Sequence, residues 1–189
     1  MKVGTDGVLL GAWVALGAAD RRLLDVGTGT GVIALMLAQR SAAAHVTALD
    51  IDAACSVQAR ANADRSPWGG RVTTLCTPVQ EYRPEEPFDL VVSNPPYVPQ
   101  SDRAAMHPNV RDHEPAEALF VPDGDPLRFY RAIARAGRRM LEPGGKLYFE
   151  IYHTAAGALE RLLAEEGYGA IRLREDMNGK PRMLCARLN

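Results

Sequence analysis

The amino-acid sequence predicts an α/β fold, a doubly wound and mostly parallel sheet with helices on both faces. Short, strongly apolar segments alternate with longer helical segments along the chain, and two motifs follow directly after such apolar segments. Short buried strands that alternate with helices are typical of parallel sheets. Ligands bind such sheets at the carboxyl ends of the strands. Both motifs are therefore expected on the ligand-binding edge.

Each element of this fold has a local signal. Pro95 and Pro96 end the fourth strand, because proline cannot donate to a sheet ladder. Gly167 ends the last helix, and Asn178-Gly179 is a hairpin-type turn signal before a closing antiparallel strand. Strands are expected at residues 22–26, 45–49, 72–76, 89–93, 146–151, 170–174 and 182–188, with helices at 8–14, 30–39, 53–62, 127–140 and 154–166.

The bulk properties fit one globular domain over residues 1–189, without a separate substrate-recognition domain. The formal net charge of −1 gives no basic excess, which weakens nucleic-acid binding but leaves local patches open. No apolar run reaches about 18 residues, and no signal peptide is present. A cytoplasmic protein that contacts no membrane is expected, and the oligomeric state stays open.

The three cysteines, Cys55, Cys76 and Cys185, do not have the spacing of metal ligands, so no metal site is expected. They are interpreted as small buried apolar residues. Four arginines of the helix at 127–140 are interpreted as a solvated face rather than as a phosphate site: Arg131, Arg135, Arg138 and Arg139.

A glycine loop, DVGTGTG at residues 25–31, leaves the first strand and enters the first long helix. Glycines allow the backbone to approach a ligand closely and to adopt positive φ. A dinucleotide fold requires the pattern G-x-G-x-x-G, but position 32 is Val. Asp25 before the glycines fits a ligand with a zwitterionic amino-acid group. The expected binding residues of the loop are Asp25, Gly27, Thr28, Gly29, Thr30 and Gly31.

A second carboxylate follows the second strand. Asp50 lies 25 residues after Asp25 and is predicted to accept two hydrogen bonds from a ribose diol. Asp52 is the alternative, although it resembles a helix N-cap before Ala53.

The second motif, SNPPY at residues 93–97, follows the very apolar fourth strand. A planar amide or amino nitrogen is a poor nucleophile, because its lone pair is delocalised. We expect the Asn94 side-chain oxygen and the Pro95 carbonyl to accept its two N–H groups and so direct the lone pair at an electrophile. Pro95 and Pro96 stiffen the loop, and Tyr97 lies against the planar group. A rigid strand end with a packed tyrosine is the simpler alternative.

Taken together, DVGTGTG, LDID at residues 49–52 and NPPY at residues 94–97 resemble class I methyltransferases of the N-methylating branch. The resemblance implies a Rossmann-like fold, with S-adenosylmethionine as cofactor and S-adenosylhomocysteine as product. It implies catalytic roles for Asn94, Pro95, Pro96 and Tyr97. It also implies that the cofactor site includes Thr5, Ile51, Val79 and Asn94.

The resemblance covers the chain as a mosaic. Residues 1–13 (MKVGTDGVLLGAW) and SPW at 66–68 resemble the bacterial tRNA(Val) adenine-N6 methyltransferases. From about Phe88 onward the chain resembles the release-factor glutamine-N5 methyltransferases, through NPPYVPQSD, NVRDHEPAEALFVPDGDPLRFYRAI, LEPGGKLYFEI and DMNGKPRM. In that family Glu114-Pro115 belongs to the loop beside the acceptor.

The chain also departs from both families. It lacks the helical N-terminal domain of the glutamine enzymes and the residues that precede the tRNA enzymes' first segment. Pro78 stands where both families place Asp before the adenine contact, so adenine is expected at the Val79 backbone. The glutamine enzymes often have Glu-Ile-Gly where this chain has Glu150-Ile151-Tyr152.

Three functions follow. The favoured one is methylation of a release-factor glutamine, since the acceptor side of the chain carries that resemblance. Methylation of tRNA adenine N6 is the alternative. A cofactor-binding protein without productive substrate recognition is the third, supported by the missing recognition domain and by Pro78.

Overall fold

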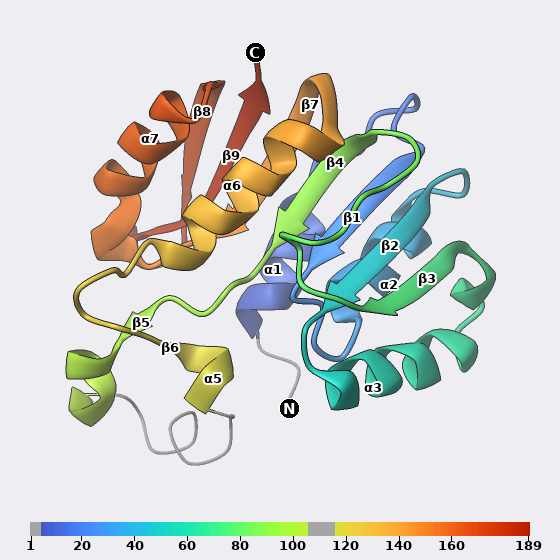
Figure 1. Cartoon of the computed structure of the whole chain (residues 1–189), viewed down its shortest axis with the longest axis horizontal. Coiled ribbons are helices and arrows are strands. Elements are labelled where there is room, and N and C mark those ends of the chain that lie inside the picture. Colours follow the sequence, from blue (N-terminus) through green and yellow to red (C-terminus); the bar gives the residue numbers. More distant parts are fainter. Residues whose placement is uncertain (1–4, 106–115) are drawn as a thin grey trace.

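The computed structural model describes residues 5–105 and 116–189, and it confirms the predicted α/β architecture (Figure 1). The main sheet has seven strands in the order β3-β2-β1-β4-β7-β9-β8. Its strands are β1 (Arg22–Val26), β2 (His45–Asp50), β3 (Val72–Cys76), β4 (Phe88–Ser93), β7 (Leu141–Glu150), β8 (Tyr168–Glu175) and β9 (Pro181–Leu188).

The main helices are α1 (Thr5–Trp13), α2 (Val32–Arg40), α3 (Ala53–Asp64), α6 (Arg128–Met140) and α7 (Ala156–Glu165). Helix α2 begins two residues later than predicted, because its N-cap Gly31 has the left-handed conformation, with φ of 81°. Between α3 and β3 lies the short helix η1 (Gly69–Arg71), and η3 (His153–Ala155) precedes α7.

The sheet is parallel except at β9, which pairs antiparallel with both β7 and β8. The turn between β8 and β9 closes where the Asp176 N–H donates to the Lys180 carbonyl, and Gly179 has a φ of 73°. Strand β7 begins at Leu141, five residues before the predicted start at residue 146. It pairs first at Leu141 with Phe88, and after a register shift it pairs again at Lys146 with Leu90.

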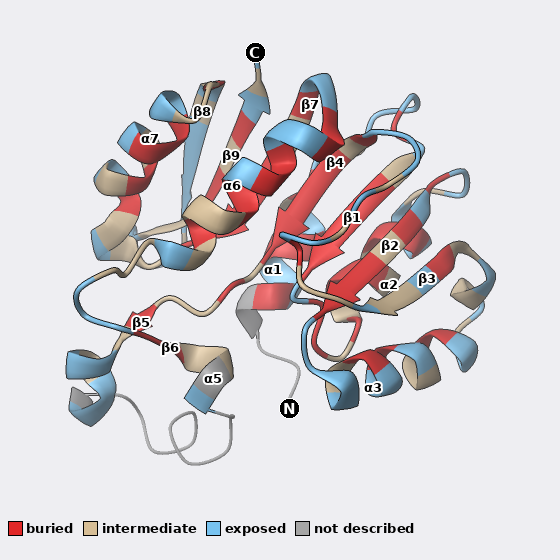
Figure 2. Cartoon of the chain, in the orientation of Figure 1, coloured by how far each residue is buried: buried red, intermediate tan, exposed pale blue. Residues whose placement is uncertain are grey.

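Two cores cover the two faces of the sheet (Figure 2). Successive strand residues alternate between them: Leu24 belongs to the core under α6 and α7, whereas Leu23 belongs to the core under α1 and α2. Both leucines are fully buried. The predicted doubly wound arrangement therefore arises from strands that bury apolar side chains on both faces.

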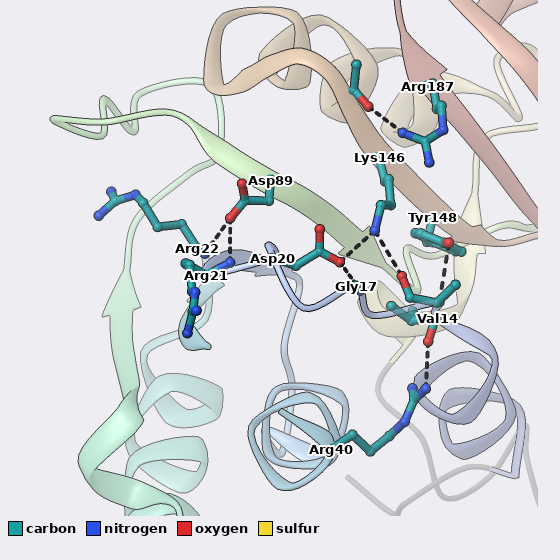
Figure 3. Close-up of polar contacts among 12 residues, drawn as sticks. Val14, Gly17, Asp20, Arg21, Arg22, Arg40, Asp89, Lys146, Tyr148 and Arg187 are labelled. Carbon is teal, nitrogen blue, oxygen red and sulfur yellow. Dashed lines mark hydrogen bonds and ion pairs between the residues drawn. The ribbon is translucent and has the colours of Figure 1, made fainter. Parts of the chain in front are cut away.

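Polar contacts fasten the amino-terminal edge of the sheet (Figure 3). Lys146 of β7 forms an ion pair with Asp20, at 2.6 Å between Nζ and Oδ2, and also donates to the Ala15 carbonyl. Asp89 Oδ2 accepts the backbone N–H groups of Arg21 and Arg22, at 2.6 and 2.7 Å. These bonds fasten the segment between α1 and β1 to β4 and β7, so α1 stays on its face of the sheet.

A smaller unit lies beyond the carboxyl end of β4 (Figure 1). It holds a two-stranded parallel sheet of β5 (Val98–Pro99) and β6 (Phe120–Val121), with the short helices η2 (Gln100–Ala105) and α5 (Ala116–Leu119). This unit follows the second motif directly.

Among the described residues, no helix is both long enough and apolar enough to cross a membrane.

Candidate functional site

The glycine loop turns sharply between β1 and α2. Gly27, Gly29 and Gly31 all have positive φ, at 71°, 55° and 81°. Side chains at such positions strain the backbone, which explains the glycine at every second position. A Cβ atom at Gly27 would meet nothing within 4 Å, whereas one at Gly31 would lie 3.2 Å from the Ala59 Cβ. Open space therefore lies above Gly27, while Gly31 allows α3 to pack closely.

Hydrogen bonds fix this loop from both sides. The N–H groups of Gly27 and Thr28 both donate to the Leu49 carbonyl at the end of β2. Asn62 of α3 donates from Nδ2 to the Thr30 carbonyl at 2.8 Å. Strand β2 and helix α3 therefore hold the loop in place.

Asp25 supports the loop from below. Its side chain is fully buried, and Oδ2 accepts from the Thr28 hydroxyl at 2.6 Å and from the Ala34 N–H at 3.1 Å. Oδ1 has no hydrogen-bond partner among the described residues. Burial raises the pKa of Asp25 to about 7, against the lowering effect of these bonds. The buried carboxylate therefore shapes the loop through Thr28 and Ala34, and a direct contact of Asp25 with the cofactor stays a prediction.

Asp50 stands beside the loop. Its Oδ2 accepts from the Gly29 N–H at 2.8 Å, and its Oδ1 accepts from the Asp52 N–H at 3.0 Å. Asp52 caps α3 as predicted, by accepting from the Ala54 N–H. Since an ionised carboxylate has about four acceptor positions, Asp50 retains capacity for two hydroxyl groups after these bonds.

The surroundings of Asp50 fit a cofactor with a ribose and a flat base. Ile51 follows it with 74% of its surface exposed at the carboxyl end of β2. Val79 is buried in the core under α6 and α7. Open space at Gly27, acceptor capacity at Asp50 and an uncovered apolar surface at Ile51 together match S-adenosylmethionine.

The second motif lies next to the glycine loop because β4 and β1 are neighbours. Ser93 pairs in register with Val26, and its hydroxyl donates to the Val26 carbonyl at 2.7 Å. Asn94 and Gly27 are the next residues of the two strands. Gly7 of α1 lies against the same place, since a Cβ there would be 3.9 Å from Asn94 Nδ2.

Within the motif, Ser93 and Pro95 are buried, and Asn94, Pro96 and Tyr97 are partly exposed. Tyr97 donates its hydroxyl to Glu150 Oε1 at 2.6 Å and stacks on Tyr152, with ring centroids 5.9 Å apart. The structure therefore brings residues 94–97 to the predicted place, on the carboxyl edge and beside the loop.

Sequence reasoning missed three residues around Tyr97. Glu150 is fully buried at the carboxyl end of β7, Tyr152 follows it, and Asp102 of η2 accepts the Tyr152 hydroxyl at 2.6 Å. An acidic residue at the end of an apolar strand was the available signal, as it was for Asp50. Its significance was overlooked because the partner Tyr97 is 53 residues away in the sequence.

Other predictions meet the structure unevenly. Thr5 begins α1, but its side chain is outside the description, and Glu114-Pro115 lies in the undescribed residues 106–115. The cysteines are not buried as predicted: Cys76 is exposed because its strand lies at the sheet edge, and Cys55 and Cys185 are partly exposed. The helix arginines are mostly ion-paired: Arg131 with Asp125, and Arg135 and Arg138 with Glu166. Because acidic side chains of the protein itself pair with these arginines, the structure agrees with a solvated helix face rather than a phosphate site.

Known proteins resemble this chain over most of its length. It is 44% identical over 168 residues to the release factor glutamine methyltransferase of Bacteroides thetaiotaomicron, which covers 88% of this chain and 60% of that protein. It is 55% identical over 148 residues to the tRNA1(Val) (adenine(37)-N6)-methyltransferase of Aeromonas hydrophila, with coverage of 78% and 58%. The chain thus spans about three fifths of the length of these curated relatives.

Among solved structures, an S-adenosylmethionine-dependent O-methyltransferase from Thermotoga maritima superposes with a TM-score of 0.70 at 14% identity, over 100% of this chain and 66% of that one. The sheet order and the glycine loop therefore define a class I methyltransferase fold. Residues 7–113 match the methyltransferase small domain family, and the chain belongs to that family. Family and fold together imply S-adenosylmethionine as the methyl donor.

Proposed function

We propose that this chain methylates the side-chain amide nitrogen of a glutamine in a peptide chain release factor. The observation that carries the proposal is the register pair of Val26 and Ser93. It brings the donor loop that starts at Gly27 next to the acceptor motif that starts at Asn94. Donor and acceptor groups held on adjacent strands gain the large rate advantage of fixed proximity.

The chemistry of the acceptor explains the motif. The Asn94 side-chain oxygen and the Pro95 carbonyl each accept one N–H of the amide, which turns the nitrogen lone pair toward the donor loop. When bound, the cofactor supplies an electrophilic methyl group. The nitrogen loses its proton only after it has become cationic, so no strong base is required beforehand. Positioning and electrostatics supply the catalysis.

Two observations favour a protein substrate. The release factor enzyme of Bacteroides thetaiotaomicron matches 88% of the chain. The segment that follows the motif, residues 98–131, has six acidic residues and four basic ones. An acidic balance in the segment that follows the acceptor motif disfavours a phosphate backbone.

Adenine N6 of a tRNA is the second candidate. The 55% identity to the Aeromonas enzyme favours it, and an exocyclic amino group offers the same two N–H donors to Asn94 and Pro95. Both candidate substrates are components of translation. The prediction of a cytoplasmic location is therefore the same for either one.

One experiment separates the candidates. The purified chain is incubated with S-adenosylmethionine labelled in its methyl group and, in separate reactions, with unmethylated release factor and with unmodified tRNA(Val). We expect label in the release factor at a glutamine. Label in tRNA alone would contradict the proposal and support the second candidate. Label in neither, with cofactor binding confirmed by calorimetry, would support a cofactor-binding protein without productive recognition.

A further inference from the structure

Tyr97 is the residue of the acceptor motif with the most defined surroundings. Its hydroxyl donates to Glu150 Oε1 at 2.6 Å, a short O–H···O hydrogen bond. One face of its ring lies against Tyr152, with an angle of 21° between the ring planes. The edge and one face of the phenol are therefore both occupied by residues from the end of β7.

Glu150 is itself held rigidly. Its side chain is fully buried, and its backbone carbonyl accepts from the Tyr130 hydroxyl of α6 at 3.0 Å. The next residue, Ile151, donates its N–H to the Arg182 carbonyl of β9 at 2.8 Å. Burial of a carboxylate is costly unless it is well bonded. The backbone at Glu150 is therefore held between a core helix and a core strand, and the buried carboxylate presents Oε1 to Tyr97.

Tyr152 is fixed at its other end as well. Its hydroxyl donates to Asp102 Oδ2 at 2.6 Å, and this bond is the main cause that raises the pKa of Tyr152. Asp102 belongs to η2, which lies in the small unit beyond β4. The ring of Tyr152 thus has a fixed orientation between the edge of the main sheet and the small unit beyond β4.

We infer that Glu150 and Tyr152 are positioning residues for methyl transfer: they hold the Tyr97 ring in one orientation, so that a planar acceptor meets only the face opposite Tyr152. The inference rests on the proposed function, since it assigns the surroundings of the acceptor nitrogen. A ring free to rotate would allow the acceptor plane to tilt, and small errors in alignment lower the rate of transfer strongly.

The orientation of Tyr97 is measurable without turnover. We suggest 3-fluorotyrosine at position 97, observed by fluorine NMR in the whole chain. The resonance is expected to be displaced from that of the free amino acid, and to move toward it in Glu150→Gln and in Tyr152→Ala. Tyr168→Phe, which removes a hydrogen bond to the Ala134 carbonyl far from the site, serves as the control. A wild-type resonance at the position of a freely rotating ring would overturn the inference.

Kinetics then test whether orientation matters for transfer. In Tyr152→Ala we expect kcat with release factor to fall about 2- to 10-fold, the range for loss of one aromatic pair. Glu150→Gln keeps an oxygen that can accept from Tyr97 and removes only the charge, so we expect a fall in kcat of about 5- to 10-fold, the difference between a charged and a neutral hydrogen bond. Binding of S-adenosylhomocysteine should stay unchanged in both variants. Tyr152→Phe keeps the stacked ring and loses the bond to Asp102, so it should restore part of the rate, which excludes misfolding as the cause of the fall in Tyr152→Ala.

A double-mutant cycle identifies the path of the effect. If Glu150 acts through Tyr97, Glu150→Gln has little further effect on kcat in a Tyr97→Phe background. An equal loss in both backgrounds would show that Glu150 acts independently and would overturn its positioning role. If wild-type protein methylates neither release factor nor tRNA, the proposed function fails together with the kinetic role. The fluorine resonance distinguishes that result from a Tyr97 ring that is not held.

Discussion

In the proposed mechanism, Asn94 acts in methyl transfer more than in cofactor binding, so a substitution at this residue can separate the two steps. We expect Asn94→Ala to abolish transfer to the acceptor nitrogen, because the side-chain oxygen that accepts its N–H is lost. Much of the cofactor affinity should remain, since the loop at residues 27–31 and Asp50 are unchanged. Calorimetric titration with S-adenosylhomocysteine and a methylation assay on the same preparation test this. Equal losses of binding and transfer would make Asn94 chiefly a cofactor ligand.

Asp50 is the residue with the clearest predicted effect on cofactor affinity. We expect Asp50→Ala to weaken binding by about 1.5–3 kcal/mol, the range for a hydrogen bond to a charged group. Part of that loss comes from the Gly29 N–H, which the carboxylate holds at 2.8 Å. Calorimetry measures the change in Kd, and Asp52→Ala is the matched control. An unchanged Kd would move the ribose role away from Asp50.

For single residues, the sequence predicted the place in the fold better than the side chains that each residue contacts. The loop glycines, Asp50 and residues 94–97 lie where the pattern of strands and motifs placed them. The burial of Asp25 was not predictable, because it depends on Ala34 and Thr28 closing over the carboxylate. Glu150 and Tyr152 were missed for the same reason, since their partners come from distant parts of the chain.

Among the elements, α3 offers a direct test of a predicted cap. Asp52 accepts the Ala54 N–H at 2.9 Å at the start of this helix. We expect Asp52→Ala to lower the free energy of unfolding by about 1 kcal/mol, the usual cost of losing an N-cap. Urea unfolding followed by circular dichroism measures it. A stability equal to that of the wild type would mean that water accepts the Ala54 N–H as well as the Asp52 side chain does.

Most elements were predicted from apolar runs and from turn residues, and the errors lie at their boundaries. The register shift of β7 follows from residues 142–145, which lie between the helix predicted at 127–140 and the strand predicted at 146–151. They belong to the strand as an irregular stretch, where Gly144 has a φ of 80°. A local pattern shows that a strand is interrupted, but the partner strand decides whether pairing continues.

For the whole molecule, Asp25 predicts a pH dependence of stability. Its pKa is raised to about 7 in the folded protein, chiefly by burial, from 3.8 in an exposed aspartate. The folded state therefore binds an additional proton between these values. The contribution of Asp25 to stability is complete below about pH 4 and is lost as the pH rises through 7, by up to roughly 4 kcal/mol.

Substitution Asp25→Asn removes this titration while keeping an oxygen that accepts from Thr28 and Ala34. We expect the free energy of unfolding of the variant, relative to wild type, to increase from pH 5 to pH 8. Urea unfolding at both pH values provides the comparison. Parallel pH profiles for the two proteins would show that Asp25 keeps an ordinary pKa in the folded state.

The register pair of Val26 and Ser93 has a consequence for how specificity is divided. Donor loop and acceptor motif share one hydrogen-bonded ladder, and adjacent strands in such a ladder keep a spacing of about 4.8 Å. The donor loop and the acceptor motif therefore cannot move apart unless the pairing of β1 and β4 at the centre of the sheet is broken. A substrate-binding module attached to this unit would decide which nitrogen arrives, and how often, without altering the alignment at which transfer occurs. Exchange of such a module should therefore change KM far more than kcat.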